Sequence, residues 1–330
     1  MAAAKKTTMT KKTSSKRKRS SKKTMTPAGR HLRFELTNSG NAGTETSHFL
    51  DIASALSKTN RRLYRQGRDY HIKKITIVSS NTPNAGVPGS PNNRISFSTV
   101  NDGWVSQMAW RRAFNLWNRQ NKGASANVAG DISGTWSDFK VYLSRDMQTG
   151  TIIQPRDNGG NNYNTGDWVY TNLVTPDGTT GADEFLVHLL GDHVGSVGAW
   201  TSVGLIKSYG ESRATVQIAD PNVPSVVSDD PLVNVFDYGT TVDEVLDNLE
   251  AHNDAPPYGV FNYPGDDANA PKPIVKQETT IVDGRATVGG FMARCGLIEI
   301  EATSPIANDV YSVLVELAPG SYRGVKADVI

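Results

Sequence analysis

Short runs in which apolar and polar residues alternate recur along most of the chain. The segment His31–Thr37 reads His-Leu-Arg-Phe-Glu-Leu-Thr, with a large apolar side chain at every second position. Such alternation is typical of a β-strand with one face in a core and the other face toward water. Similar runs occur at Tyr70–Ser79, Ile95–Val100, Phe139–Ser144, Trp168–Val174, Glu184–Leu190, Val203–Ile218, Ile274–Val282, Ala286–Glu301 and Val310–Leu317. The pattern therefore predicts roughly eight to ten strands.

Long polar connections separate these strands. They are Asn81–Asn93, Asp157–Gly166, Asp220–Pro231 and Asn253–Pro273. Loops of this length are uncommon in a compact domain unless they bind a partner or take part in assembly. Because strands outnumber helices and no fixed-period repeat is present, we predict a mainly β fold. The expected architecture is a β-sandwich, of which the single jelly roll with eight or more antiparallel strands is one version, over residues 31–330 with one or two inserted helices.

One predicted helix covers Trp104–Asn121. Trp110, Ala113, Phe114 and Trp117 recur at the i, i+3, i+4 and i+7 spacing of an apolar helix face. Arg111, Arg112, Arg119 and Lys122 fall roughly opposite that face. These cations could form a second nucleic-acid contact, or they could simply be the solvated side of a helix whose aromatic side chains pack into a core.

A second helix is predicted to begin at Thr241. The sequence Thr241-Val-Asp-Glu is a capping box, and Val242, Val245, Leu246 and Leu249 form one apolar stripe. The polar side of this helix would carry Asp243, Glu244, Asp247 and Glu250. We therefore expect an acidic helix that lies away from nucleic acid or meets a basic neighbour.

Charge is divided very unevenly between the first 30 residues and the rest. Eleven of the 35 Lys and Arg residues lie in Met1–Arg30, which has no Asp or Glu, so the remaining 24 face all 33 acidic residues and the rest of the chain is net −9. We call Met1–Arg30 the basic arm, and its cations are Lys5, Lys6, Lys11, Lys12, Lys16, Arg17, Lys18, Arg19, Lys22, Lys23 and Arg30. With Met as its only large apolar residue type, the arm cannot bury enough surface to offset its conformational entropy, so we predict disorder.

The basic arm has the chemistry of a phosphate-binding tail. Lysines on a flexible chain neutralise nucleic-acid phosphates without reading bases, and the arm has no aromatic residue for base stacking. Lys16-Arg17-Lys18-Arg19 also fits the short basic pattern of a nuclear localisation signal. Three other uses of such a tail are solubility, binding to anionic lipid and targeting as a transit peptide, although a transit peptide would need an amphipathic apolar face.

The remainder of the sequence favours an intracellular protein without a membrane span. The single cysteine, Cys295, excludes an intramolecular disulfide framework and lies in a strand-like run where a buried thiol is expected. No apolar run approaches the length of a transmembrane helix, and no apolar segment follows the basic start as in a secretory signal.

Motifs for catalysis or for cofactors are not recognisable. His188 and His193 lack the Glu and the four-residue spacing of a helical zinc-protease motif, so they are expected to be core or edge histidines. Two acidic pairs, Asp229-Asp230 and Asp266-Asp267, could in principle bind calcium, but adjacent acids in Pro-rich loops are usually solvated. We therefore predict no enzymatic activity, no metal and no cofactor.

A basic arm followed by a strand-rich body with long loops resembles the coat proteins of small viruses. The closest resemblance is to the capsid proteins of circular, replication-protein-encoding single-stranded DNA viruses, the circovirus-like group. The residues that carry it are Lys16–Arg19, the Trp110–Trp117 segment and Asn253-Asp-Ala-Pro-Pro-Tyr258.

The resemblance implies a virion protein that self-assembles around its genome. It implies an icosahedral shell of about 60 or 180 copies, whose combined arm charge is of the order needed to neutralise a single-stranded DNA genome of about one to a few kilobases. The arm would line the particle interior and contact the DNA, and assembly would follow import into the host nucleus by the host import machinery. Outer loops would meet a host receptor that the sequence does not identify.

Two other classes of protein fit parts of the sequence. One is a cellular chromatin-associated or ribosome-associated protein with a basic tail on a β-sandwich. The other is a lectin-like jelly roll in which Trp168 and Tyr170, beside an Asn/Gly-rich loop, would stack on sugar. Only a coat protein would form closed particles of uniform diameter.

Overall fold

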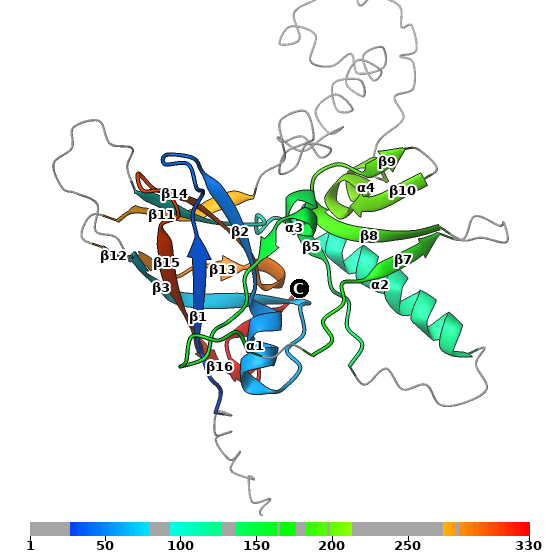
Figure 1. The fold of residues 1–330 in the computed structure, drawn as a ribbon. Helices are drawn as coiled ribbons and strands as arrows, with labels where there is room; N and C mark the ends of the chain where they lie inside the picture. Colours follow the sequence, from blue (N-terminus) through cyan, green and yellow to red (C-terminus); the bar gives the residue numbers. More distant parts are fainter. Residues whose placement is uncertain are drawn as a thin grey trace, which may run out of the picture.

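The structure is a computed structural model of the 330-residue chain. It describes residues 27–79, 93–126, 136–163, 166–175, 183–196, 199–212, 273–281 and 284–330. The fold of these residues is mainly β, with two sheets stacked as a sandwich and a third sheet beside them (Figure 1). The mainly β prediction is therefore confirmed for the part of the chain that is described.

The first sheet of the sandwich has six strands, all paired antiparallel. Its central order is β1-β15-β3-β12. The short strands β13 and β18 pair with the first residues of β3. The strands are β1 (His31–Thr37), β3 (Arg68–Ser79), β12 (Arg285–Gly289), β13 (Met292–Ala293), β15 (Val310–Leu317) and β18 (Ala327–Val329). A small hairpin, β16 (Pro319–Gly320) with β17 (Gly324–Val325), lies between β15 and β18 in the chain.

The second sheet of the sandwich has the order β11-β4-β14-β2-β6. Its strands are β2 (Thr46–Asp51), β4 (Arg94–Thr99), β6 (Thr151–Ile152), β11 (Ile274–Thr280) and β14 (Leu297–Thr303). All neighbours are antiparallel except β6, which pairs parallel with the edge of β2. The strand β11 begins with Ile274 paired to Thr99, the last residue of β4.

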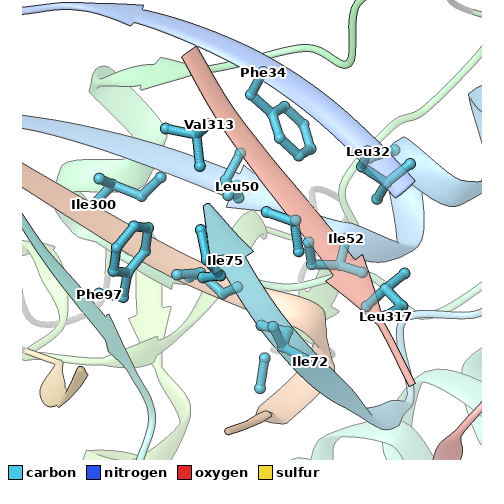
Figure 2. Packing of buried hydrophobic residues seen from close by; sticks show 14 of the residues in the cluster. Leu32, Phe34, Leu50, Ile52, Ile72, Ile75, Phe97, Ile300, Val313 and Leu317 are labelled. Carbon is cyan, nitrogen blue, oxygen red and sulfur yellow. The ribbon is translucent and has the colours of Figure 1, made fainter. Parts of the chain in front are cut away.

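Alternating side chains of the two sheets fill the sandwich core. In β1, Leu32, Phe34 and Leu36 are buried, whereas the residues between them are more exposed. All three belong to one cluster with Leu50 of β2 and Phe97 of β4 from the opposite sheet, and Figure 2 shows Leu32 and Phe34 in this core. This burial of every second residue is what the sequence pattern predicts.

A helix that the sequence pattern did not predict follows β2 directly. Helix α1 (Ile52–Asn60) begins at Asp51, whose Oδ1 accepts a hydrogen bond from the backbone N–H of Ser54 at 2.9 Å. It ends at Arg61, which takes the left-handed conformation with φ of 52° and donates its N–H to the Ser57 carbonyl. The first half of α1 is buried in the sandwich core.

A long insertion separates β4 from β11 and carries the third sheet, with the order β5-β8-β10-β9; β7 pairs with the first half of β8, along the same edge as β5. Its strands are β5 (Tyr142–Ser144), β7 (Asn172–Thr175), β8 (Asp183–Leu190), β9 (Val194–Ser196) and β10 (Ala199–Gly204). Its helices are α2 (Trp104–Ala126), α3 (Arg145–Thr149) and α4 (Leu205–Glu211). Figure 1 shows this sheet, with α2 and α4, beside the sandwich.

The third sheet encloses a second hydrophobic core. Helix α2 buries Trp110 and Ala113, with Phe114 and Trp117 partly buried on the same face, so the predicted apolar stripe is confirmed. These side chains pack around Phe139, which is fully buried. The cluster also includes residues of β2 and β14, so it is continuous with the sandwich.

Some strand boundaries differ from those that the sequence predicted. The run Val203–Ile218 is not one strand, because β10 stops at Gly204 and α4 begins at once. Leu205, Ile206 and Tyr209 follow helical spacing and bury their side chains in the second core. The remainder of that run, from residue 213, lies outside the described residues.

Other predicted strands are shorter than expected. The run Ala286–Glu301 divides into β12, β13 and β14, interrupted by a 3₁₀ turn (Arg294–Gly296) in which Cys295 has φ of 57°. In the runs Phe139–Ser144 and Trp168–Val174, only the last residues are paired as strands. With α1, α2, α3 and α4 in the described ranges, the expectation of one or two helices was wrong, and the helix predicted from Thr241 lies outside these ranges.

Candidate nucleic-acid interface

The described chain begins where the basic arm joins the sandwich, and this junction is fixed to the end of α1. The Asn60 side chain accepts a hydrogen bond from the Gly29 N–H at 2.7 Å and donates one to the Gly29 carbonyl at 3.1 Å. The carbonyl of Arg30 accepts from the N–H of Leu317 at 2.9 Å, which begins the pairing of β1 with β15. The arm therefore leaves the body at one defined point, beside α1.

Several cations surround that point, and we call them the basic end. Arg61 and Arg62 follow Asn60 directly; both are exposed, and neither forms an ion pair within the described ranges. The full set, contributed by the arm junction, the loop after α1 and the C-terminal hairpin, is Arg30, Arg61, Arg62, Arg65, Arg68, Arg323 and Lys326. In Figure 1, α1, the start of β1 and β16 lie at the same end of the sandwich.

Tyrosines hold the loop after α1 against the C-terminal hairpin. The Tyr64 hydroxyl donates to the Arg323 carbonyl at 2.9 Å, and the Tyr322 hydroxyl accepts from the N–H of Arg65 at 3.0 Å. The guanidinium of Arg68 lies 3.7 Å from the centre of the Tyr322 ring, a cation–π contact. Burial raises the pKa of Tyr64, against the opposing effect of nearby Arg62 and Arg323.

A buried polar network fixes the other side of the same loop. Gln66 is fully buried; its side chain donates to Asp51 Oδ2 and to the Val141 carbonyl, each at 3.1 Å, and accepts from the Val141 N–H at 2.6 Å. The N–H of Gln66 donates to Asp138 Oδ2 at 3.0 Å, and Asp138 Oδ1 pairs with Arg65 at 3.0 Å. The backbone that carries the arginines of this loop is therefore held by hydrogen bonds on both sides.

Asp51 lies at the centre of this network. Besides capping α1, its carboxylate accepts hydrogen bonds from the Trp168 indole N–H at 3.1 Å and from the Tyr170 hydroxyl at 3.2 Å. Burial raises the pKa of Asp51, although its four hydrogen-bond donors oppose the shift. Lys140 lies over the Trp168 ring, 4.8 Å from its centre, and Tyr142 stacks on Tyr170. These contacts occupy the polar atoms and one face of both rings, so the structure gives no support to a sugar-stacking site there.

The sequence-predicted cations fall in three different places. The arm cations from Lys5 to Lys23, including Lys16–Arg19, lie outside the described residues, and only Arg30 is at the basic end. Arg111 lines a cavity of about 420 Å³ together with Arg65 and Arg68. Arg112 and Arg119 are exposed on another side of α2, where they line a separate groove. Of the three α2 arginines, only Arg111 therefore adjoins the basic end.

The loop arginines of the basic end were missed at the sequence level, although a signal was present. Four arginines occur within eight residues, Arg61-Arg-Leu-Tyr-Arg-Gln-Gly-Arg68, between a helix and a strand. Their neighbour Arg323 is about 260 positions away along the chain and could not be placed beside them from sequence.

The two histidines singled out in the sequence lie among structural contacts. His188 is buried, with Nδ1 2.7 Å from Ser202 Oγ and Nε2 2.9 Å from the Asp192 carbonyl, as expected for a core histidine. His193 lies at 3.1 Å from Glu211. In the described ranges, no three His, Cys, Asp or Glu side chains gather closely enough to hold a metal ion. The Asp229-Asp230 and Asp266-Asp267 pairs lie outside those ranges.

Comparison with family models, curated proteins and solved structures finds no match. The role of the basic end is therefore inferred from its own chemistry. Exposed guanidinium groups bind phosphate oxygens by charge and paired hydrogen bonds, without selecting a base sequence. Among the described helices, none is long and apolar enough to cross a membrane.

Proposed function

We propose that this chain is the coat protein of a small virus and packages single-stranded DNA inside an icosahedral shell. The observation that carries the proposal is the attachment of a basic arm with eleven cations at the basic end of a two-sheet sandwich. The arm and the basic end share Arg30 and are both cationic, while the rest of the chain is net negative. This division of charge would direct the positive field to one side of a shell.

The order of the sandwich strands supports a jelly roll. Counted along the chain, the eight main strands are β1, β2, β3, β4, β11, β12, β14 and β15. In one sheet the first strand pairs with the eighth, the eighth with the third and the third with the sixth; in the other, the order is fifth, fourth, seventh, second. Two four-stranded sheets interleaved in this way are the jelly-roll arrangement of many viral shell proteins.

Within such a shell, the arm and the basic end would face the genome. Binding would be electrostatic and independent of base sequence, because the cations are lysines and arginines without aromatic partners in the arm. The Lys16–Arg19 cluster would in addition serve import into the host nucleus before assembly. Neither a metal nor a cofactor has a part in this mechanism.

Removing two cations of the basic end should weaken DNA binding in a salt-dependent way. For Arg61→Ala/Arg62→Ala, the slope of log K against log salt for single-stranded DNA should fall by about 1.4, because each lost phosphate contact contributes about 0.7. Fluorescence anisotropy across a salt series measures this slope. The control Arg145→Ala/Arg285→Ala removes two exposed cations from other parts of the surface and should leave the slope unchanged. If the two double variants gave equal slopes, the basic end would not be part of the nucleic-acid interface.

The proposal is tested by assembly and by nucleic-acid content. Three proteins are compared: the full-length chain, a chain that starts at Thr26, and a full-length chain with the ten cations from Lys5 to Lys23 changed to Gln. Sedimentation and negative-stain microscopy measure assembly, and nuclease treatment followed by quantification measures protected nucleic acid. Uniform particles from the full-length chain, with nucleic acid that both variants lose, are expected.

Two outcomes would overturn the proposal. A monomer or small oligomer that binds nucleic acid without forming particles would favour the cellular nucleic-acid-binding protein. Particles whose nucleic-acid content is the same in all three proteins would separate assembly from the arm and leave its charge without a packaging role. Digestion of the protected material by DNase or by RNase identifies the nucleic acid.

A further inference from the structure

A groove with an apolar floor runs along one side of α2. Its volume is about 560 Å³, and α2, α4 and the third sheet form its walls. The lining residues are Ala109, Arg112, Ala113, Asn115, Leu116 and Arg119 of α2, Leu205, Ser208 and Tyr209 of α4 with Ser212 after it, and Leu173, Phe185 and Val203 of the sheet. On α2 the lined stretch from Ala109 to Arg119 is about 15 Å long at 1.5 Å per residue.

The groove combines apolar surface with positive charge. Leu116 is 40% exposed. It is part of the groove lining and not an isolated apolar residue on the surface. Among the described residues that line it, Arg112 and Arg119 are the only charged ones, and none is an Asp or a Glu. The Arg112 guanidinium donates to Ser212 Oγ and lies 5.9 Å from the centre of the Tyr209 ring. Arg119 forms no ion pair with any described residue.

The groove lies beside the point at which a long further segment of the chain begins. Ser212 lines the groove, and residues 213–272 follow it outside the described ranges. That segment contains Thr241–Glu250, for which the sequence predicts an amphipathic helix with four apolar residues on one face and four carboxylates on the other. Ten residues of helix are about 15 Å long, which matches the lined stretch of α2.

We propose that Thr241–Glu250 of the same chain binds as a helix in this groove. Val242, Val245, Leu246 and Leu249 would cover the apolar floor, and the acidic face would meet Arg112 and Arg119 at the rim. The 28 residues between Ser212 and Thr241 are far more than the distance requires, since an extended chain spans about 3.3 Å per residue. Attachment to the groove wall gives this segment a millimolar effective concentration, which favours it over the same segment of a second copy. The inference concerns one chain and is independent of the proposed function.

Disulfide capture tests the proposal in the full-length chain. Leu116→Cys and Leu246→Cys are combined, and the matched control combines Met108→Cys with Leu246→Cys. Met108 is on the same helix and is 41% exposed, almost as exposed as Leu116, but it does not line the groove. The native Cys295 is fully buried, and burial raises the pKa of its thiol, so it stays in both variants.

Under mild oxidation, the Leu116 pair is expected to form its disulfide at least about ten times faster than the Met108 pair, because a disulfide requires the two Cβ atoms to approach within about 4 Å. Chains labelled with ¹⁴N and ¹⁵N are mixed before oxidation, and mass spectrometry identifies which chain supplies each cysteine of the linked peptides. Linked peptides from a single chain are expected. Equal rates for the two pairs would overturn the groove as the binding site, and mixed-isotope peptides would assign it to a second copy.

Charge reversal gives a second, independent measurement. In the Leu116 pair, Arg119→Glu should slow disulfide formation several-fold, because the rim then repels the acidic face. Arg111→Glu, an equal charge change on the other side of α2, should leave the rate unchanged. The same slowing by both substitutions would contradict the proposed role of the groove arginines.

Discussion

Replacing Arg294 by alanine is expected to lower the free energy of unfolding by about 3–5 kcal/mol, the cost of leaving one member of a buried ion pair alone. Arg294 is 3% exposed, and its Nη2 lies 3.3 Å from Asp69 Oδ2 and 2.7 Å from Asp102 Oδ1. Its Nη1 donates to Ser106 Oγ at 2.7 Å and to the Gly103 carbonyl at 3.2 Å. One side chain thus joins the sandwich to the start of α2, and urea unfolding measures the loss.

The pH dependence of the stability of the Arg294→Ala variant tests whether the buried charge of Asp69 causes the loss of stability. Burial raises the pKa of Asp69, and Arg294 opposes that shift, so the pKa should rise further when the guanidinium is removed. A carboxyl with a raised pKa in the folded state favours folding below its unfolded pKa and loses that contribution as pH rises through the folded value. The difference in free energy of unfolding between the wild type and Arg294→Ala should therefore be smaller at pH 5 than at pH 7. Arg294→Ala/Asp69→Asn should recover part of the stability at pH 7, and a deficit under about 1 kcal/mol would contradict the buried-charge explanation.

Replacing Asp51 by asparagine is expected to lower the free energy of unfolding by about 3 kcal/mol, because a buried charged hydrogen-bond acceptor with four donors is lost. With the new amide oxygen still accepting from Ser54, the amide NH2 would replace Oδ2 and face the N–H groups of Gln66 and Trp168. Asp167→Asn changes an exposed aspartate of the same segment as Trp168 and should cost less than about 0.5 kcal/mol.

The difference between wild type and Asp51→Asn should widen as pH falls from 7 toward 4. The folded-state pKa of Asp51 is raised, so the wild type gains stability as pH falls through that value, and the gain is complete below the unfolded pKa near 4. Asparagine cannot take up this proton. Urea unfolding of both proteins at several pH values gives the difference directly, and a gap that narrows on acidification would show that Asp51 is stabilised as the carboxylate.

The sandwich could be predicted well from sequence because its strands bury one face. Leu32, Phe34 and Leu36 alternate with polar residues, and the structure buries these three side chains. The run from Val203 gave a wrong strand, because four or five apolar residues near a glycine fit a buried strand and a short helix equally well. The segment forms a helix because this conformation buries Leu205 and Tyr209 against α2. That contact is not visible in a local sequence window.

The candidate interface was predictable only in part. The charge of the basic arm is evident in composition, whereas the basic end depends on the meeting of Arg61–Arg68 with Tyr322 and Arg323 through hydrogen bonds between distant positions. Helix α1, which positions Arg61, was missed because its nine residues are short and its apolar residues are concentrated in the first half. Its one clear sequence signal is Asp51, a residue type that favours the start of a helix.

The pairing of Thr99 with Ile274 affects how fast the chain folds and where its sequence can vary. The long insertion between β4 and β11 leaves and re-enters the sandwich at two residues that are direct partners in one ladder. Closing a loop of this length slows folding more than it lowers stability, because the entropic cost grows only with the logarithm of loop length. A sandwich with such a junction tolerates gain or loss of sequence in the parts of the insertion that do not contact it, whereas β6, which pairs with β2, and Asp138 and Trp168, which bond to Gln66 and Asp51, must stay in place. Those remaining parts of the insertion can thus diversify while the two sheets keep their geometry.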